Sequence, residues 1–193
     1  IDNLDLEKVN IKTGKNSEII VNDQMQTNIE NIYAIGDVTN KAMLAHVASH
    51  QAMVAVNNIL QKEDHITYNA IPSVIFSSPE IAYVGLSEEE CRQEDIVIGK
   101  YPFTALGKAH SDGNTFGFAQ IIADKKTKKI IGAQIIGSNA SNLIAEMTLA
   151  INKGLKIEDI QKTIHVHPTD SEIWNEAAFV ATKTPINFPP LTN

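Results

Sequence analysis

The residues with the most chemistry to offer lie together near the end of the chain, in the run IHVHPTDSE at 164–172. A histidine oriented by a carboxylate forms a general-base pair, because the carboxylate fixes the tautomer and stabilises the imidazolium that forms. Glu172 follows His167 by five positions, and His165 and His167 share a face if the segment is extended. The run is therefore a candidate acid/base site built on His167 and Glu172.

Two other interpretations of the same run stay open. Thr169 and Glu172 have the Thr-x-x-Glu spacing of a capping box, in which Glu172 closes the start of a helix. Both roles are compatible if each carboxylate oxygen serves one of them. His165, His167, Asp170 and Glu172 are also competent metal ligands. Zinc prefers paired cysteines or two histidines four apart on a helix, so we expect no metal here.

A second candidate site lies in the run NIYAIGDV at 31–38. Gly36 and Asp37 follow an apolar stretch directly, and open α/β sheets bind their ligands at the carboxyl ends of such strands. A glycine lets a ligand approach the backbone, and an aspartate accepts a hydrogen bond from a sugar or ribityl hydroxyl. The alternative is a strand that simply ends in a Gly-Asp turn.

The elements that position this second site are predicted to be two short strands and a helix. Residues 18–21 and 31–35 have strand character, and the latter run is apolar enough for burial on both faces. A helix at 42–60 carries one stripe at helical spacing, formed by Leu44, Val47, Ala48, Gln51, Ala55 and Ile59. The polar residues 61–69 indicate a linker. This order is typical of the last stretch of an α/β dinucleotide-binding domain.

Beyond Pro72 the pattern changes to strands followed by helices, which predicts a separate α+β domain with an antiparallel sheet. The predicted strands are 74–76, 81–84, 96–103, 115–123 and 129–136, with a turn at 124–128. An amphipathic helix at 140–151 should end at Gly154, and a last helix should run over 171–182. We expect an extended tail from Pro185 onward. The predicted domains are thus 1–68 and 69–193.

Composition sets outer limits on function. Hydrophobic residues make up 43% and charged residues 20% of the chain, which is close to the average for soluble globular proteins. The net charge of -7 leaves no basic stripe for nucleic acid, and no apolar run approaches the roughly 20 residues of a membrane helix. With no signal peptide at its start, we expect a cytoplasmic protein. The single cysteine, Cys91, lies in an acidic stretch and is predicted to be an unreactive, partly buried residue.

Taken in order, five motifs resemble the flavin-dependent pyridine nucleotide-disulfide oxidoreductases, and within them the dihydrolipoamide dehydrogenases. They are NIYAIGDV at 31–38, LAHVA at 44–48, PSVIFSSPEIAYVG at 72–85, GAQIIG at 132–137, and HVHPTDSE at 165–172. The closing residues 186–188, INF, are also similar to that family's usual ending. The resemblance covers nearly the whole chain. It implies FAD as the cofactor, with NAD in the full-length protein.

The resemblance also implies roles for particular residues. Asp37 would hydrogen-bond the ribityl chain of FAD beside Gly36, and the turn formed by Leu44, Ala45 and His46 would place Ala45 next to the flavin ring at a helix start. In the later motif, His167 would take a proton from the dihydrolipoamide thiol while Glu172 holds its ring. Pro168 would follow a cis peptide bond.

Partners follow from the same resemblance. The domain at 69–193 would be the dimer interface of a homodimer, in which the histidine reaches the redox disulfide of the other subunit. The enzyme would serve the lipoyl domain of an acyltransferase and the other subunits of a 2-oxo-acid dehydrogenase complex. A related disulfide reductase such as glutathione reductase is an alternative, because glutathione reductases carry a similar His-Pro-Thr-x-x-Glu. The Leu-Ala-His turn and the doubled His-x-His of this sequence resemble the lipoamide branch instead. Mercuric reductases end in a cysteine pair, which this sequence lacks.

Some positions depart from the family pattern. Gln51-Ala52 replaces a common Glu-Gly, and Leu106 and Asn142 replace a common Asn and Glu. The family's Gly-x-Gly-x-x-Gly, Cys-x4-Cys and second glycine motif are absent from these 193 residues, so we expect this chain alone to be inactive. The rival hypothesis is a dimerisation or docking module that performs no chemistry.

Overall fold

In the computed structural model, which describes residues 1–188, the chain divides into two compact units. The first unit is Ile1–Tyr68 and the second is Asn69–Asn193. The last part of the tail predicted to be extended, residues 189–193, lies outside the described residues. Among the residues that are described, no helix is both long and apolar enough to cross a membrane.

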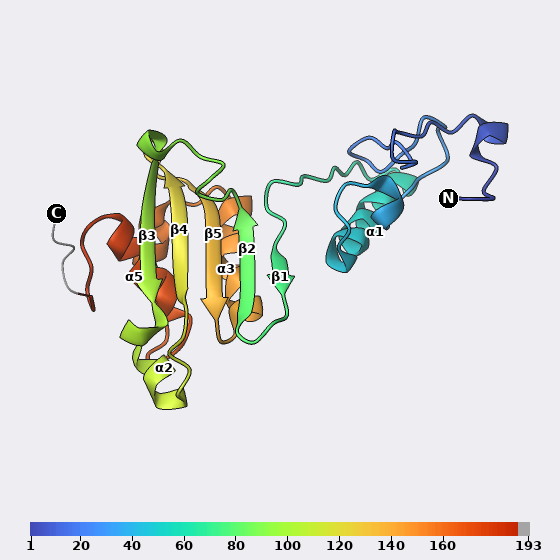
Figure 1. Cartoon of the computed structure of the whole chain (residues 1–193). Helices are drawn as coiled ribbons and strands as arrows, with labels where there is room; N and C mark the ends of the chain where they lie inside the picture. Colours follow the sequence, from blue (N-terminus) through green and yellow to red (C-terminus); the bar gives the residue numbers. More distant parts are fainter. Residues whose placement is uncertain (189–193) are drawn as a thin grey trace. The chain divides into compact units, whose positions relative to one another are not determined.

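The second unit is built on a five-stranded antiparallel sheet (Figure 1). The strands lie in the order β1-β2-β5-β4-β3. Their bounds are Ser73–Ile75 for β1, Glu80–Gly85 for β2, Ile96–Pro102 for β3, Phe118–Asp124 for β4 and Ile130–Gly137 for β5. The predicted α+β class with an antiparallel sheet is confirmed, and each predicted strand overlaps an observed one.

Helices cover one face of this sheet (Figure 1). Helix α3, Ala140–Asn152, packs on β2 and β5, and helix α5, Glu172–Ala181, packs on β3 and β4. Between these layers lie fully buried side chains, the largest of which are Trp174, Tyr101, Phe103, Ile121, Ile135, Met147 and Ile173. Two further helices, α2 at Gly107–Asp112 and α4 at Ile157–Lys162, were not predicted, because six residues are too few to establish a helical period.

The connections follow the predicted turn chemistry. Asp124 accepts hydrogen bonds from the amide and the hydroxyl of Thr127, each at 2.6 Å, and this closes the turn between β4 and β5. Helix α3 ends at Asn152, two residues before Gly154, whose φ of 64° is left-handed and whose amide donates to the Ile151 carbonyl. The predicted end of this helix is confirmed.

One glycine determines how closely helix α5 lies on the sheet. A Cβ atom at Gly99 in β3 would overlap the carbonyl oxygen of Ala177 in α5. The helix backbone therefore rests directly on the strand backbone, an approach that any larger side chain would prevent. This contact fixes the position of α5, whose first residue is Glu172.

The first unit has less regular structure. It contains the helix α1, Ala45–Ile59, and two 3-10 turns, η1 at Leu6–Val9 and η2 at Gly36–Thr39. Its small core consists of Ile19, Val21, Met25, Ala34, Val54, Ala55 and Ile66. The predicted helix at 42–60 is confirmed, although it begins later, at Ala45.

The prediction of two strands in this unit, at 18–21 and 31–35, is wrong. Within its described residues, only isolated bridges form, between Thr13 and Ile19 and between Gln26 and Tyr33. A strand needs a partner that runs alongside it over several residues, and these segments meet only at single pairs. Ile35 is 39% exposed, so the run 31–35 is also not buried on both faces.

Candidate functional site

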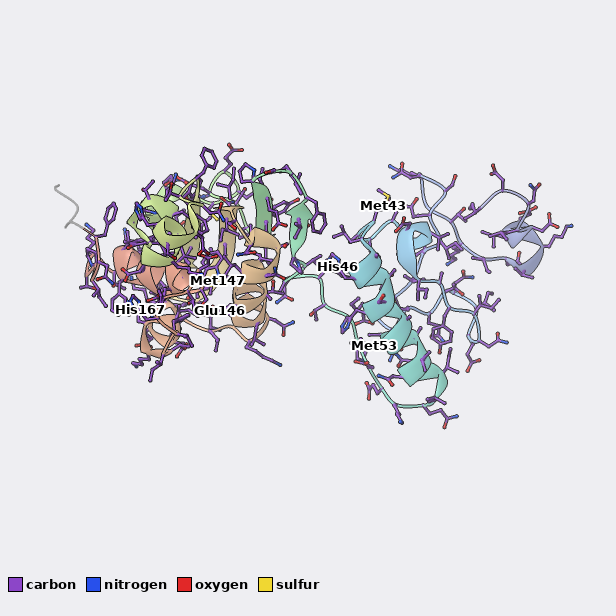
Figure 2. The ribbon with its side chains drawn as sticks, turned by 90° about the horizontal axis from the view of Figure 1, so that it is seen from below. Met43, His46, Met53, Glu146, Met147 and His167 are labelled. Carbon is purple, nitrogen blue, oxygen red and sulfur yellow. The ribbon has the colours of Figure 1, made fainter. Side chains whose placement is uncertain are left out.

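His167, which is labelled in Figure 2, forms a hydrogen-bonded pair with Glu172 in the second unit. His167 Nδ1 lies 2.9 Å from Glu172 Oε1. The other oxygen, Oε2, accepts the backbone amide of Thr169 at 2.8 Å. The first contact is the predicted general-base pair. The second is one half of the predicted capping box; the other half does not form, because the Thr169 hydroxyl bonds the Val166 carbonyl and helix α5 begins at Glu172 itself. The carboxylate both orients the imidazole and satisfies an amide in front of helix α5.

The pair is positioned by a tightly bonded turn and a buried helix. The Thr169 hydroxyl donates to the Val166 carbonyl at 2.6 Å, which closes the turn that follows His167. Glu172 begins α5, and two residues further the fully buried Trp174 donates its indole N–H to the Leu143 carbonyl at 2.9 Å. The carboxylate is therefore attached to the best-packed part of the unit.

The imidazole of His167 points outward. Its side chain is 79% exposed, whereas that of Glu172 is 21% exposed. A carboxylate only accepts hydrogen bonds, so Nδ1 carries the proton, and the lone pair of the neutral ring is then on Nε2. Among residues 1–188, no group bonds that Nε2. The geometry presents an oriented proton acceptor at the surface. The His167-Pro168 peptide is cis, as the resemblance implied.

His165 does not share this environment. Its side chain is only 7% exposed, and its Nε2 lies 2.9 Å from Glu146 Oε1 on α3. The hydrogen bond to Glu146 raises the pKa of His165 above its ordinary value, against the opposing effect of burial. Asp170 turns to another partner and accepts a hydrogen bond from Asn139 Nδ2 at 2.9 Å. The four candidate metal ligands are therefore not gathered around one point, and the described residues contain no group of three or more that could hold a metal ion.

The Gly36-Asp37 turn lies in the first unit, as the 3-10 turn η2 against helix α1. Gly36 has a left-handed φ of 76°, which favours glycine, and its Cα faces Ala48, whose Cβ would lie 3.5 Å from an added Cβ. Asp37 is exposed, and so are Ala45 and His46 at the start of α1. The sequence-predicted residues of this site thus lie on η2 and at the start of α1, two elements of the first unit that contact each other.

These residues fit part of a flavin site. Helix α1 begins after Leu44 without a side-chain cap, so the positive end of its dipole favours an electron-rich group at this place. The exposed carboxylate of Asp37 suits a hydroxyl donor. When bound, FAD would supply the electron-pair transfer. By the resemblance, Asp37 would hold its ribityl chain, and the turn formed by Leu44, Ala45 and His46 would place Ala45 beside its ring.

A buried polar residue that sequence reasoning did not single out for function holds the turn in place. Gln51 on α1 is fully buried. Its Oε1 accepts the Gly36 amide at 2.6 Å, and its Nε2 donates to the Tyr68 hydroxyl at 3.0 Å. The signals in the sequence were an amide on an otherwise apolar helix stripe and a departure from the family pattern at the same residue.

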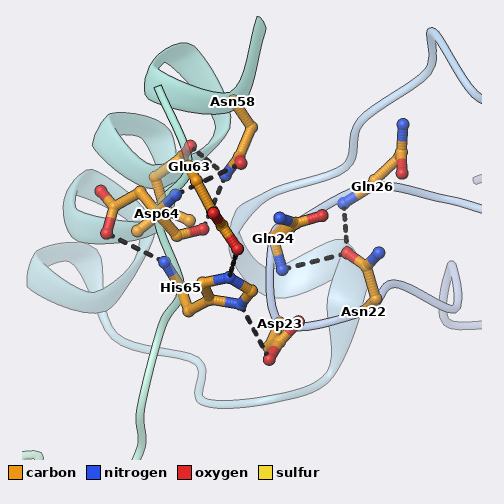
Figure 3. A network of polar contacts seen from close by, with 9 residues as sticks. Asn22, Asp23, Gln24, Gln26, Asn58, Glu63, Asp64 and His65 are labelled. Carbon is orange, nitrogen blue, oxygen red and sulfur yellow. Dashed lines mark hydrogen bonds and ion pairs between the residues drawn. The ribbon is translucent and has the colours of Figure 1, made fainter. Parts of the chain in front are cut away.

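Elsewhere in the first unit, His65 forms a surface network (Figure 3). Its Nδ1 lies 3.0 Å from Asp23 and its Nε2 lies 3.3 Å from Glu63. Hydrogen bonds to Asp23 and then Glu63 raise the pKa of His65.

The single cysteine, Cys91, lies in the second unit. Burial and then the charge of Glu90 raise the pKa of this partly buried thiol, which agrees with its predicted lack of reactivity.

Comparison with known proteins assigns both units to one family. The profile of the pyridine nucleotide-disulphide oxidoreductase dimerisation domain matches residues 71–178, and that of pyridine nucleotide-disulphide oxidoreductase matches residues 1–52. The dihydrolipoyl dehydrogenase of Chlamydia pneumoniae is 51% identical over 89% of this chain and 38% of its own length. That of Chlamydia muridarum is 47% identical over 98% of this chain and 41% of its own length.

A solved structure agrees with this assignment. The crystal structure of LpdA from Mycobacterium tuberculosis superposes with a TM-score of 0.86 at 27% identity, covering 92% of this chain and 39% of LpdA. The chain therefore spans about two fifths of the length of the relatives that it matches. With a profile match over more than half of its residues and a fold that agrees, the chain belongs to the pyridine nucleotide-disulphide oxidoreductase family.

Proposed function

We propose that the protein to which this chain belongs is a dihydrolipoyl dehydrogenase, which oxidises dihydrolipoamide with NAD by way of FAD. The observation that carries the proposal is the His167–Glu172 pair, with Nδ1 held at 2.9 Å and Nε2 directed outward. The names of the relatives that match nearly the whole chain support it. The 193 residues by themselves supply the proton-handling group and part of the flavin site.

The pair would work as a general base. Nε2 of His167 takes the proton from a dihydrolipoamide thiol, and the thiolate that remains is the nucleophile toward a redox disulfide. The carboxylate of Glu172 stabilises the imidazolium and keeps the ring from rotating while the proton is held. The proton then returns from Nε2 to solvent or to the sulfur that leaves.

A second copy of the chain is the partner that we propose for the second unit. The dimerisation-domain match supports it, and so do exposed apolar side chains, which a soluble monomer rarely gathers in number. These include Phe76, 81% exposed, and Phe116, 67% exposed. Ile164 and Val166, which flank His165, are 96% and 71% exposed. The further partners would be the lipoyl domain of an acyltransferase and the other subunits of a 2-oxo-acid dehydrogenase complex, in the cytoplasm.

The test uses the gene product that contains these residues, assayed for lipoamide-dependent oxidation of NADH. His167→Gln removes the proton acceptor and should lower kcat by roughly 10² to 10⁴, the usual contribution of a general base. His110→Gln is the matched control, because its ring only bonds the Thr104 carbonyl at 2.7 Å. If the His167→Gln variant is yellow, and so binds flavin, and keeps full activity, the role assigned to His167 is contradicted.

The rival hypothesis, a dimerisation or docking module without chemistry, gives a different result in the same assay. It predicts a colourless gene product with no lipoamide-dependent activity before any substitution. Sedimentation of that product as a dimer would then support a binding role alone.

A further inference from the structure

The extended segment that carries His167 is tied to helix α3 on both sides of this residue. On one side, His165 Nε2 contacts Glu146 Oε1 at 2.9 Å. On the other side, Asp170 accepts a hydrogen bond from Asn139 Nδ2 at 2.9 Å. His167 lies between these two ties.

The order of the contacts shows how the segment runs. As the segment advances from His165 to Asp170, its partners go back from Glu146 on α3 to Asn139, the N-cap residue in front of that helix. Seven residues of an α-helix span about 10 Å, so the segment passes antiparallel along roughly two turns of α3. Its neighbouring side chains Ile164 and Val166 are exposed and add little attachment. In this stretch, His165 is the side chain that is buried against the helix.

His165 is built to be a cation. Its Nε2 faces the Glu146 carboxylate, and its Nδ1 lies 3.1 Å from the Thr163 carbonyl oxygen. Both partners only accept hydrogen bonds. A neutral imidazole carries one N–H and satisfies one of them, whereas the imidazolium carries two and satisfies both. His167 differs, since only its Nδ1 is bonded.

From this geometry we infer that His165, through its ion pair with Glu146, is a positioning residue that holds the segment 163–169 and thereby sets the orientation of the His167 imidazole. The functional part of this inference rests on the proposed function of His167. His165 does not touch the reacting atoms. It acts through the short backbone that joins it to His167.

The first test measures the orientation of His167 in the 193-residue chain by NMR with labelled histidine. In the unmodified chain, Glu172 should hold His167 as the Nδ1–H tautomer. Glu146→Ala should remove this bias and broaden the His167 ring signals. Glu146→Gln keeps an acceptor of the same shape and should restore most of the bias. Glu158→Gln is the matched control, because Glu158 pairs with Lys156 and Lys162 on α4.

A fold check separates positioning from unfolding. Trp174 is fully buried, so its emission reports whether the second unit is intact. If Glu146→Ala shifts the Trp174 emission, the His165→Gln variant is used in its place, because His165→Gln does not alter helix α3. An unchanged His167 tautomer in a folded His165→Gln chain would overturn the inference.

The second test measures kinetics in the gene product. A misplaced base impairs the chemical step more than substrate binding, so Glu146→Ala should lower kcat about tenfold with KM within about twofold. The two proposals fail in different ways. An inactive gene product whose NMR response is as expected would remove the proposed function and leave the positioning. If His167→Gln abolishes activity but Glu146→Ala and His165→Gln keep the wild-type kcat, the proposed function stands and the positioning role of His165 is refuted.

Discussion

The two units hold their candidate residues by different means. In the second unit, Glu172 stands on a helix that packs against a five-stranded sheet over a large core. In the first unit, the Gly36-Asp37 turn is held by two buried side chains, Gln51 and Thr39, beside a core of only seven residues. The His167–Glu172 pair is therefore supported by many packing contacts, and no single one of them is essential. The Gly36-Asp37 turn depends on a few hydrogen bonds.

The largest expected effect on stability comes from a substitution that separates α5 from the sheet of the second unit. Gly99→Ala would place a methyl group against the Ala177 carbonyl and force α5 away from β3. We expect this overpacking to lower the free energy of unfolding by about 3 kcal/mol. Urea denaturation followed by Trp174 emission measures it.

Another glycine of the same unit provides the control for this prediction. An added Cβ at Gly107 would meet no atom within 4 Å, so Gly107→Ala should change stability by no more than about 0.5 kcal/mol. Equal destabilisation by both substitutions would show that contact between α5 and β3 is not what supports the unit.

Sequence reasoning succeeded where a period is long enough to be read. The helices at 140–151 and 171–182 and the five strands of the second unit have apolar side chains at regular spacing, and Gly154 marks an end by its backbone alone. It failed at 18–21 and 31–35, where strand composition is present but the only partners are single bridge residues. Strand formation depends on a neighbour, which composition does not specify.

The candidate site divides in the same way. The Thr-x-x-Glu spacing located the contact of Glu172 with Thr169, and the five-residue interval from His167 located its contact with the imidazole, because both contacts are local in the sequence. Glu146 lies 19 positions before His165 and Gln51 lies 15 positions after Gly36. Contacts of this length are set by the packing of helices, so no spacing rule pointed to them. The proposed roles of Asp37, Ala45 and His46 stay predictions.

A second prediction tests how much the first unit depends on Gln51. Gln51→Ala would leave the Gly36 amide and the Tyr68 hydroxyl without their partner in a buried place. We expect a loss of about 2 kcal/mol, the cost of unsatisfied buried polar groups. Hydrogen exchange by mass spectrometry should show faster exchange at 34–40 and along α1, with β4 and β5 unchanged.

The control for this second prediction lies on the same helix. Ser49→Ala alters an exposed residue of α1 whose hydroxyl bonds the Ala45 carbonyl, and it should stay within about 0.5 kcal/mol. Slow exchange at Gly36 in the Gln51→Ala chain would mean that the turn has another support.

A third prediction concerns the partly buried ion pair of the second unit, formed by His165 and Glu146. The hydrogen bond to Glu146 raises the pKa of His165, with smaller contributions of the same sign from the Thr163 carbonyl and the charge of Glu172. Because the pKa of His165 is raised in the folded state, the pair contributes its full stabilisation of the fold at a pH below the ordinary histidine pKa. This stabilisation is lost as the pH rises through the folded value. NMR titration should place the His165 midpoint above that of the Glu146→Gln chain.

The smallest effect is expected at the exposed pair of the first unit. His65 also has a raised pKa, caused first by Asp23 and then by Glu63, so its contribution has the same sign and is lost as the pH rises through that value. Its side chain is 44% exposed, whereas that of His165 is 7% exposed. Mobile ions reach an exposed pair and screen it, but they screen a buried pair much less. Raising the salt concentration from 0.05 M to 1 M should therefore lower the His65 midpoint markedly and the His165 midpoint little, and equal shifts would show that the two units do not differ in how they shield their charges.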